Sequence, residues 1–460
     1  ESGSGMLLTI KNTFPRAVLF GFTGTPIFED NAHGEMTTEV IFGDMLHKYT
    51  LANGIQDGNV LGFDLYREDT FPEDEIREQV AVRQALKSDP DFVDESVNGV
   101  VYTVDDIADD PFKMEIYNKW KDDTDMIKIE DEAKSLYYSE RHHMEVIRKI
   151  VSERPTLGKG GKFHAILATK SIPEAIEYYH LFKAHYPQYN VTAIFDDSID
   201  NNEKSIYKED AILEMLEDYN TKFETSFQQS TYAKYKKDVA KRLAHKGPYL
   251  HVTKDKQLDL LIVVTQMLTG YDSKWVNTLY VDKLLQYVDV IQAFSRTNRL
   301  FGPDKPFGII KYFTRPNRMA KNIDDALELY VDQPLSVFTD KLEANLEKIN
   351  LNFKTIDALF AAEGISFYSE LPKAEASRKK FAKEFCEMTK RIEASKMQGF
   401  FWDKLEYEFE HTNGWVKLKV EIDEQTYKIL LQRYRELFTG GGGGSNDDDV
   451  YQLEAYITET

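Results

Sequence analysis

Short apolar runs alternate with amphipathic segments between residues 142 and 316. The helical segments are His142 to Glu153 and Ile172 to Tyr186, and Pro173 suits the first turn of the second one. Residues 200–250 are highly charged and suggest helices that decorate the same domain. Each apolar run has the composition of a strand buried on both faces, and the runs lie at residues 163–168, 191–195, 258–265, 277–282 and 307–313. This alternation predicts a doubly wound α/β domain with a parallel sheet.

The pattern changes on both sides of this domain. Residues 17–22 form an apolar run that predicts a buried parallel strand ending at a loop. Residues 70–140 are acidic with little periodicity, which indicates a partly helical insertion. Long helical patterns follow Pro316, and strand signals return only near residue 415, so we expect a helical domain there.

These changes divide the chain into six parts. The chain starts at Glu1 without methionine, and we interpret this start as a cut inside a longer protein. The glycine run from Gly440 to Gly444 predicts a flexible linker. The expected parts are the end of a first α/β domain (1–60), a linker with an acidic insertion (61–141), a second α/β domain (142–316), a helical domain (317–438), a Gly-rich linker (439–449) and the start of a further element (450–460).

Composition narrows the class of protein. The chain is 42% hydrophobic and 29% charged, as soluble globular proteins are. No apolar stretch approaches the roughly 20 residues that a membrane span needs, so we expect a cytoplasmic protein without a membrane partner. The single cysteine, Cys386, excludes an internal disulfide and fits a reducing compartment. A net charge of −21 argues against a protein that coats nucleic acid with its whole surface, and leaves room for a local basic groove.

Histidine and lysine patterns give weak signals. No His-x-x-x-His pair or Cys/His cluster occurs, so the sequence predicts no metal ligands. His142 and His143 are adjacent and would point in different directions on a helix, so we expect ordinary surface residues. A basic run could line a DNA path, although a solvated helix face is the favoured interpretation; it contains Lys236, Lys237, Lys241 and Arg242.

The strongest chemical signal lies between Gln292 and Arg299. If Tyr287 to Arg299 is a helix, Gln292, Arg296 and Arg299 share one face, and the apolar residues face a sheet. Arginine stays charged and presents a rigid fork of donors, which suits a polyphosphate. Taken alone, a surface helix with solvated arginines explains the same pattern.

Two loops add to this signal. Gly270 and Asp272 follow the apolar run at 258–265, so we expect them at the carboxyl edge of the sheet, where they would meet Arg296 and Arg299. Gly270 permits close backbone approach, and Asp272 can accept from a ribose hydroxyl or orient an arginine. The second loop, Thr23-Gly24-Thr25-Pro26, places hydroxyls after the expected strand, where they can relay hydrogen bonds between domains. Taken alone, each loop is better explained as a plain turn.

In their order along the chain, these segments resemble motifs III, V and VI of superfamily 2 helicases. Residues 168–170 fall where motif IV would lie. The sequences of residues 21–26 and 292–300 are most similar to the motor (restriction) subunit of type I restriction endonucleases. This resemblance runs from the first residues to about Phe313. It implies a RecA-like parallel sheet, the second of two helicase domains, followed by a C-terminal helical domain.

The resemblance also implies a function and assigns residues to it. The implied activity is ATP-dependent translocation on double-stranded DNA, within a complex that contains methyltransferase and specificity subunits. Arg296 and Arg299 would be arginine fingers at the γ-phosphate. The remaining assignments are Gln292, Gly270 and Asp272 at the ATP cleft, Thr169, Lys170 and Thr265 on the DNA backbone, and Thr23, Gly24 and Thr25 in domain coupling.

Two motifs of such motors are missing from the sequence. No Gly-x-x-x-x-Gly-Lys-Ser/Thr loop occurs, and no acidic magnesium-binding box precedes Thr23. The family carries both motifs, and its nuclease domain, upstream; we therefore expect ATP and Mg²⁺ to be held there, and this piece alone to be inactive. Pro90-Asp91 with Glu132-Ala133-Lys134 imitates a nuclease signature, but a charged insertion is favoured.

Two alternatives remain open at this point. One is another superfamily 2 motor, such as a type III restriction or repair translocase. The other is a non-catalytic α/β interaction module whose helical region binds a protein.

Overall fold

The computed structural model describes residues 9–439 apart from residues 11, 19, 29–36, 96–99, 196–204, 265–267, 269, 332–333 and 413. The expected linker at 439–449, apart from Thr439, and the expected element at 450–460 lie outside the described residues, and so does Thr265. Among the described residues, no helix is both long and apolar enough to cross a membrane.

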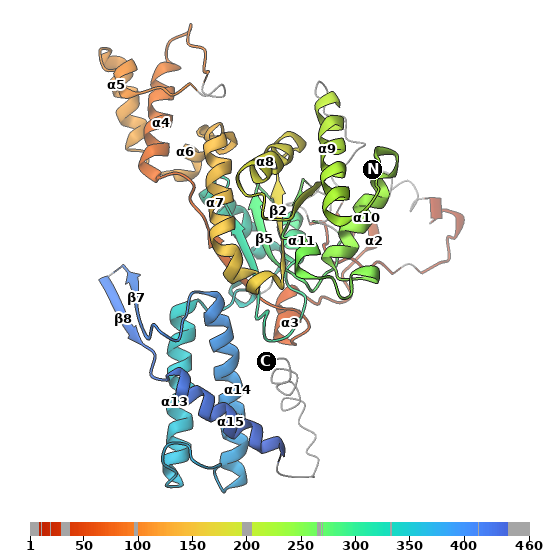
Figure 1. Cartoon of the computed structure of the whole chain (residues 1–460). Helices are drawn as coiled ribbons and strands as arrows, with labels where there is room; N and C mark the ends of the chain where they lie inside the picture. The colour runs from red at the N-terminus through yellow and green to blue at the C-terminus, as the bar shows by residue number, and fades with distance from the viewer. Residues whose placement is uncertain are drawn as a thin grey trace.

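The centre of the molecule is a six-stranded parallel sheet (Figure 1). Its strand order is β1-β6-β5-β2-β4-β3, so the chain moves in both directions from β2. Every residue of β2, β4, β5 and β6 is buried, as strands covered on both faces require. The strands are β1 (Phe63–Arg67), β2 (His164–Thr169), β3 (Val191–Ile194), β4 (Leu260–Val263), β5 (Val276–Asp282) and β6 (Gly308–Tyr312). The five predicted strands of the central domain are confirmed, and the fold is the RecA-like α/β class.

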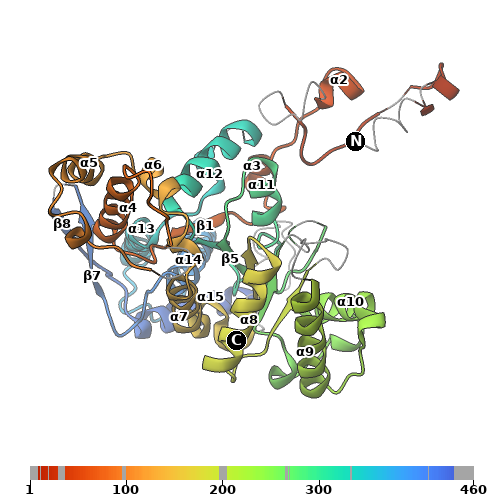
Figure 2. The ribbon, with the colours of Figure 1, turned by 90° about the horizontal axis from the view of Figure 1, so that it is seen from above.

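Helices cover both faces of the sheet. Figure 2 shows α7 (Glu140–Leu157) and α8 (Ile172–His185) on one side, and α11 (Val288–Phe294) and α12 (Pro316–Tyr330) on the other. The hydroxyls of Ser139 and Ser171 accept backbone N–H groups at the starts of α7 and α8, which fixes where these two predicted helices begin. Beside β3 lie α9 (Ser205–Phe223) and α10 (Tyr232–Leu243); the Tyr235 hydroxyl of α10 donates to the carbonyl of Ala193 at 3.1 Å.

Strand β1 was not expected from the sequence. It pairs with β6 in parallel register from Phe63↔Gly308 to Arg67↔Tyr312. Its five residues mix apolar and polar types, with Asp64 and Arg67 among them, so they carry no continuous apolar signal. Asp64 is fully buried and accepts from the amide of Gln398 at 2.9 Å, which ties the edge strand to the C-terminal helices.

The buried strand expected at residues 17–22 is wrong. The described residues of this run form no strand, and the side chains of Phe20 and Phe22 are 67% and 96% exposed. An apolar run becomes a strand only where a neighbouring strand pairs with its backbone, and none of the described strands does so here. Two short helices follow, α2 (Thr38–Phe42) and α3 (Leu51–Gln56).

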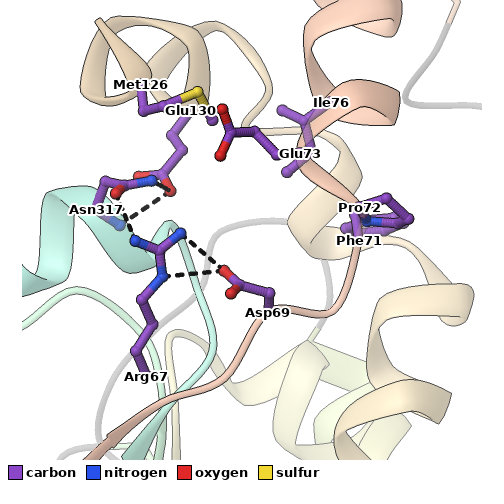
Figure 3. Close-up of a pocket in the computed structure, with 9 residues that line it drawn as sticks. All are labelled: Arg67, Asp69, Phe71, Pro72, Glu73, Ile76, Met126, Glu130 and Asn317. Atoms are coloured by element: carbon purple, nitrogen blue, oxygen red, sulfur yellow. Dashed lines mark hydrogen bonds and ion pairs between the residues drawn. The ribbon is translucent and has the colours of Figure 1, made fainter. Parts of the chain in front are cut away.

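The acidic segment is more regular than its periodicity indicated. It forms α4 (Glu73–Leu86), α5 (Pro111–Lys121) and α6 (Met126–Glu132), which enclose two small apolar cores. The buried carboxylate of Glu130 accepts the backbone N–H groups of Asn317 and Arg318, both at 2.9 Å, at the start of α12. A pocket opens between this contact and the start of α4 (Figure 3). It contains none of the predicted site residues.

The C-terminal region is a helical body with its own core, below the sheet in Figure 1. Its helices are α13 (Leu342–Ala362), α14 (Glu375–Met397) and α15 (Glu424–Thr439). An antiparallel hairpin of β7 (Glu406–His411) and β8 (Gly414–Lys419) projects from it and accounts for the strand signal near residue 415.

A pair of buried histidines lies at the amino edge of the sheet. The Nε2 atoms of His164 and His245 are 2.8 Å apart, and the His245 ring stacks on Trp275 with centroids 3.9 Å apart. Burial lowers the pKa of His164 to about 3 and the pKa of His245 to about 4. Both imidazoles are therefore neutral in the folded protein at neutral pH.

This pair predicts a pH-dependent stability. Unfolded imidazoles titrate near pH ~6.5, so below that pH the unfolded chain binds more protons than the folded one. The stability present above about pH 6.5 is lost as the pH falls toward 4. We expect His245→Gln to make this fall shallower, measured as the free energy of unfolding in urea at pH 7 and pH 4.5. The exposed His251→Gln should retain the wild-type slope; equal slopes in all three proteins would contradict the prediction.

Candidate functional site

The helix that carries the strongest motif is shorter than predicted. α11 ends at Phe294, so the expectation that it continues to Arg299 is wrong. Two hydroxyls hold carbonyls at its end: Ser295 Oγ donates to Ile291 O at 2.6 Å, and Thr297 Oγ1 donates to Phe294 O at 3.0 Å. In these bonds the two hydroxyls donate to carbonyl groups that would accept backbone N–H groups if the helix continued.

Arg296 lies half-buried in the turn after α11. Its Nε donates to the carbonyl of Gln292 at 3.0 Å, and its Nη1 donates to the carbonyl of Tyr271. The guanidinium therefore joins α11 to the segment that precedes β5, and its position is fixed by backbone atoms.

Arg299 is more open and pairs with the predicted acidic residue. Its Nε donates to Asp272 Oδ1 at 2.6 Å, and the two side chains are 42% and 64% exposed. Gly270 nearby has a φ of +70°, and nothing lies within 4 Å of the position that a Cβ atom would occupy. Asp272, Arg296 and Arg299 therefore lie close together as predicted, but not at the predicted edge of the sheet.

The edge at which they converge is the opposite of the predicted one. Asp272 lies just before β5, and the chain after Arg299 runs to the start of β6. The carbonyl of Asn298 accepts from Leu61 N at 2.8 Å, directly before β1. The ring of Phe301 packs between the residues that precede β2 and β5, with centroids 4.8 Å from Phe163 and 4.7 Å from Trp275. Leu61, Phe163 and Trp275 each precede a strand of the parallel sheet, so these contacts lie at its amino edge.

The predicted coupling loop touches the arginine segment. Gln292 Nε2 donates to Thr25 Oγ1 at 3.3 Å, and the Tyr330 hydroxyl donates to the carbonyl of Pro26 at 3.1 Å. Thr23 and Gly24 are exposed, and Thr23 Oγ1 accepts the N–H of Thr25 at 3.2 Å. Residues 25–28 therefore lie against α11 and α12.

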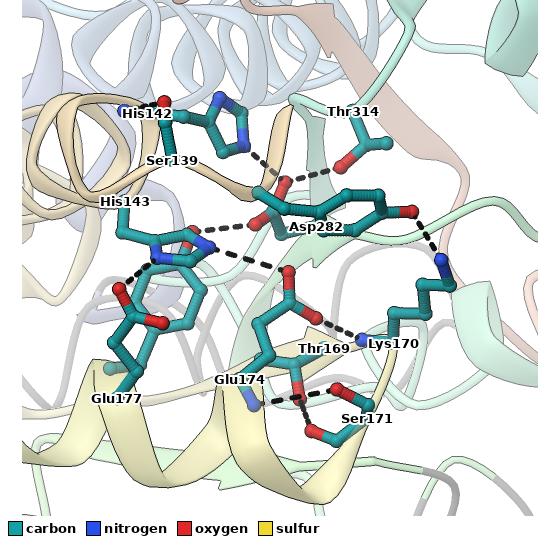
Figure 4. Close-up of polar contacts among 12 residues, drawn as sticks. Ser139, His142, His143, Thr169, Lys170, Ser171, Glu174, Glu177, Asp282 and Thr314 are labelled. Atoms are coloured by element: carbon teal, nitrogen blue, oxygen red, sulfur yellow. Dashed lines mark hydrogen bonds and ion pairs between the residues drawn. The ribbon is translucent and has the colours of Figure 1, made fainter. Parts of the chain in front are cut away.

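Thr169 and Lys170, the two predicted DNA-backbone residues that the structure describes, lie at the other edge of the sheet (Figure 4). Thr169, the last residue of β2, is fully buried, and its hydroxyl donates to Val263 O at 3.3 Å. Lys170 is exposed, and its Nζ donates to the Tyr138 hydroxyl at 2.6 Å while lying 4.1 Å from the ring centroid. Lys170 is thus the member of this group whose side chain is available at the surface.

Arg242 does not belong to an open basic face, as the run at 236–242 suggested. It is 3% exposed and lies over the rings of Phe223 and Tyr249, at 4.0 and 4.2 Å from their centroids. Lys237 and Lys241 remain exposed on α10.

His142 and His143 are buried, so their expected surface position is wrong. The residues lie in the first turn of α7, which packs against α8 and the carboxyl edge of the sheet, and both rings are covered. His142 Nε2 lies 2.8 Å from Asp282 Oδ1, and Nδ1 lies 2.7 Å from the Thr70 hydroxyl (Figure 4). The cap at Ser139 places both histidines in the first turn of this helix, but the sequence carried no signal for their burial.

Comparison of the sequence with known proteins places this chain in a family. The family model for the SWI2/SNF2 ATPase matches residues 2–101, and the one for Type I restriction enzyme subunit R domain 3 matches residues 161–315. The type I restriction enzyme SauMRSORF196P endonuclease subunit of Staphylococcus aureus (strain MRSA252) is 33% identical over 331 residues, which cover 70% of this chain. The chain is homologous to the R subunits of type I restriction enzymes.

More distant R subunits extend the match. The putative MjaVIIIP endonuclease subunit of Methanocaldococcus jannaschii is 23% identical over 420 residues, which cover 87% of this chain and 37% of that protein. This chain spans 30% of the length of the staphylococcal endonuclease subunit. The sequence resemblance to the R-subunit family is confirmed.

The exposed position of the Arg299–Asp272 pair predicts a small effect on folding. Solvent-exposed ion pairs contribute roughly 0–1 kcal/mol, so Arg299→Gln and Asp272→Asn should each change the free energy of unfolding by less than about 1 kcal/mol. Arg242→Met should cost more than about 2 kcal/mol, because it leaves buried polar partners without a donor. Urea denaturation of the three variants measures the contrast, and a large loss for Arg299→Gln would assign that residue a structural role.

Proposed function

We propose that this chain is the second motor domain of an ATP-driven double-stranded DNA translocase in a type I restriction-modification enzyme. The observation that carries the proposal is the open Arg299–Asp272 pair beside Arg296 and Gly270. The homology to R subunits and the ATPase match at residues 2–101 support it.

The residues present fit a polyphosphate at this edge. ATP bound between two domains would supply a phosphoanhydride bond and a concentrated negative charge, part of which Mg²⁺ would neutralise. Arg299 keeps an exposed fork of donors for such a charge, and Asp272 orients that fork until it is used. The bare backbone at Gly270 leaves room for close approach. The phosphate-binding loop and the magnesium ligands have no counterpart in this sequence, so another domain must provide them.

Arg296 and Gln292 have different parts in this proposal. Two backbone carbonyls hold the Arg296 guanidinium in a fixed position. Its remaining N–H donors therefore point in one direction, and the side chain does not move toward a ligand. Gln292 links α11 to Thr25, so a shift of the arginine segment is passed to the loop at 23–28. Thr23 and Gly24 would extend this coupling to the preceding domain.

DNA contact belongs to the opposite edge in this proposal. Lys170 presents a charge there, and the backbone around Thr169 and Thr265 would add hydrogen bonds to phosphates. Such contacts read no bases, which suits a motor whose partners are double-stranded DNA and separate specificity and methyltransferase subunits.

The first test is loss of ATPase activity in a protein that joins this chain to its phosphate-binding domain. Removing an arginine finger costs on the order of 10³-fold in turnover, so Arg299→Ala should lower DNA-stimulated ATPase at least ~100-fold. Arg296→Ala should also lower it, whereas Arg148→Ala on the exposed face of α7 should leave it unchanged. Wild-type turnover in the Arg299 variant would remove the arginine finger from the proposal.

The second test concerns Lys170. If Lys170 contacts a phosphate, Lys170→Ala should weaken binding to duplexes of any sequence and reduce the slope of log affinity against log salt by roughly 0.9. Fluorescence anisotropy at several salt concentrations measures this slope. The control is Lys379→Ala on α14, which removes another exposed lysine, one that pairs with the carboxylate of Glu375. Equal slopes for wild type and Lys170→Ala would place the DNA elsewhere.

A further inference from the structure

Three ligand-type side chains meet at the carboxyl edge of the sheet, from three different elements. His143 comes from α7, Glu174 from α8 and Asp282 from the end of β5. Their candidate ligand atoms all lie within 4.8 Å of one another. The side chains are 1%, 5% and 0% exposed. This is the edge at which open α/β sheets bind ligands, across the sheet from the arginine segment.

The orientation of His143 leaves one nitrogen for the cluster. Its Nδ1 lies 3.0 Å from Glu177 Oε1 on the solvent side of α8. Its Nε2 lies 3.4 Å from Glu174 Oε1, and neither ring nitrogen nor this oxygen has a hydrogen bond of normal geometry. A carboxylate beside one imidazole nitrogen while the other points inward is the arrangement found behind metal-binding histidines.

Neighbouring groups hold the two carboxylates in place from behind. Asp282 accepts from His142 at 2.8 Å and from the hydroxyls of Tyr178 and Thr314. Glu174 uses its second oxygen, Oε2, to accept the backbone N–H of Lys170 at 2.7 Å. Figure 4 shows His143 and the two carboxylates turned toward the same space. Each ligand is therefore oriented before anything binds.

Charge favours a cation in this space. Two carboxylates are buried within a few ångströms of each other and of the His143 imidazole, and burying such charges is costly unless a positive group, either the protonated imidazole or a metal ion, compensates them. One imidazole nitrogen and two carboxylate oxygens suit a divalent transition ion such as Zn²⁺ or Mn²⁺ better than Mg²⁺, which prefers oxygen alone.

We propose that His143, Glu174 and Asp282 bind one divalent transition-metal ion. The ion clamps α7, α8 and the end of β5 together. It also fixes the turn at Lys170, since Glu174 holds both the ion and the backbone of that residue. The site is independent of the Mg²⁺ that accompanies ATP, because the arginine segment lies at the other edge of the sheet.

The test is titration of the chelator-treated chain with ZnCl₂, followed by calorimetry. Wild type should bind one tightly held ion, and its thermal midpoint should rise with added Zn²⁺. His143→Gln and Glu174→Gln should each weaken binding at least ~100-fold, and Glu177→Gln roughly 10-fold because it supports the imidazole from behind. His180→Gln is the matched control: His180 lies on α8, and its Nε2 forms a similar pair at 2.8 Å with Glu214 of α9, but in an exposed position.

Circular dichroism should show that each variant is folded, and a wild-type measurement covers the case in which one is not. Co²⁺ titrated into the wild type should give visible d–d bands without the intense thiolate band that binding at Cys386 would produce. No saturable binding of Zn²⁺ or Co²⁺ by wild type below about 100 μM, well above the range expected of a structural site, would overturn the proposal. Loss of binding in His180→Gln but not in His143→Gln would assign the ion to the exposed pair and overturn it as well.

Discussion

Burial of the parallel sheet on both faces is the constraint on which the rest of the structure depends. Four of its strands bury every side chain, so the faces have no room for open polar groups. Polar chemistry is left to the two edges, where strands give way to loops and helix ends. The arginine segment occupies the amino edge, and the histidine and carboxylate cluster occupies the carboxyl edge. The two groups are therefore separated by the length of the strands, and each must act through the sheet or through its covering helices.

The parts of the fold that the sequence predicts are those with continuous local signals. The buried strands are apolar over their whole length, and the serine caps mark where α7 and α8 begin. Strand β1 escaped prediction because its partner lies far along the chain and its residues alternate in character. The edge occupied by Asp272 also could not be read from the sequence, since a loop after one strand is at the same time the loop before the next. The burial of His142 and His143 depends on how α7 docks, which is a tertiary property.

The site itself was predicted in part. Asp272 and Arg299 do meet, although the helix that was expected to bring the arginines together ends at Phe294, and the contact of Gln292 with Thr25 was not predicted. The contacts come instead from a turn fixed by hydroxyl and guanidinium bonds to backbone carbonyls. A turn held in this way positions one arginine firmly and leaves the other free to change partners. This difference in mobility between Arg296 and Arg299 follows from their different burial. The sequence motif alone does not show it.

The pairing of β1 with β6 has a consequence for how the protein is made. Phe63 and Gly308 are neighbours in the sheet, so the edge strand has no partner until almost 250 further residues have left the ribosome. Throughout that interval, the α4–α6 segment is synthesised and can close its own small cores, while β1 remains an unpaired edge. The sheet can be completed only late in synthesis, by a contact between distant parts of the chain, and such contacts form slowly. A nascent chain released before β6 would expose an adhesive strand, which makes truncated products of this domain natural substrates for chaperones and proteases.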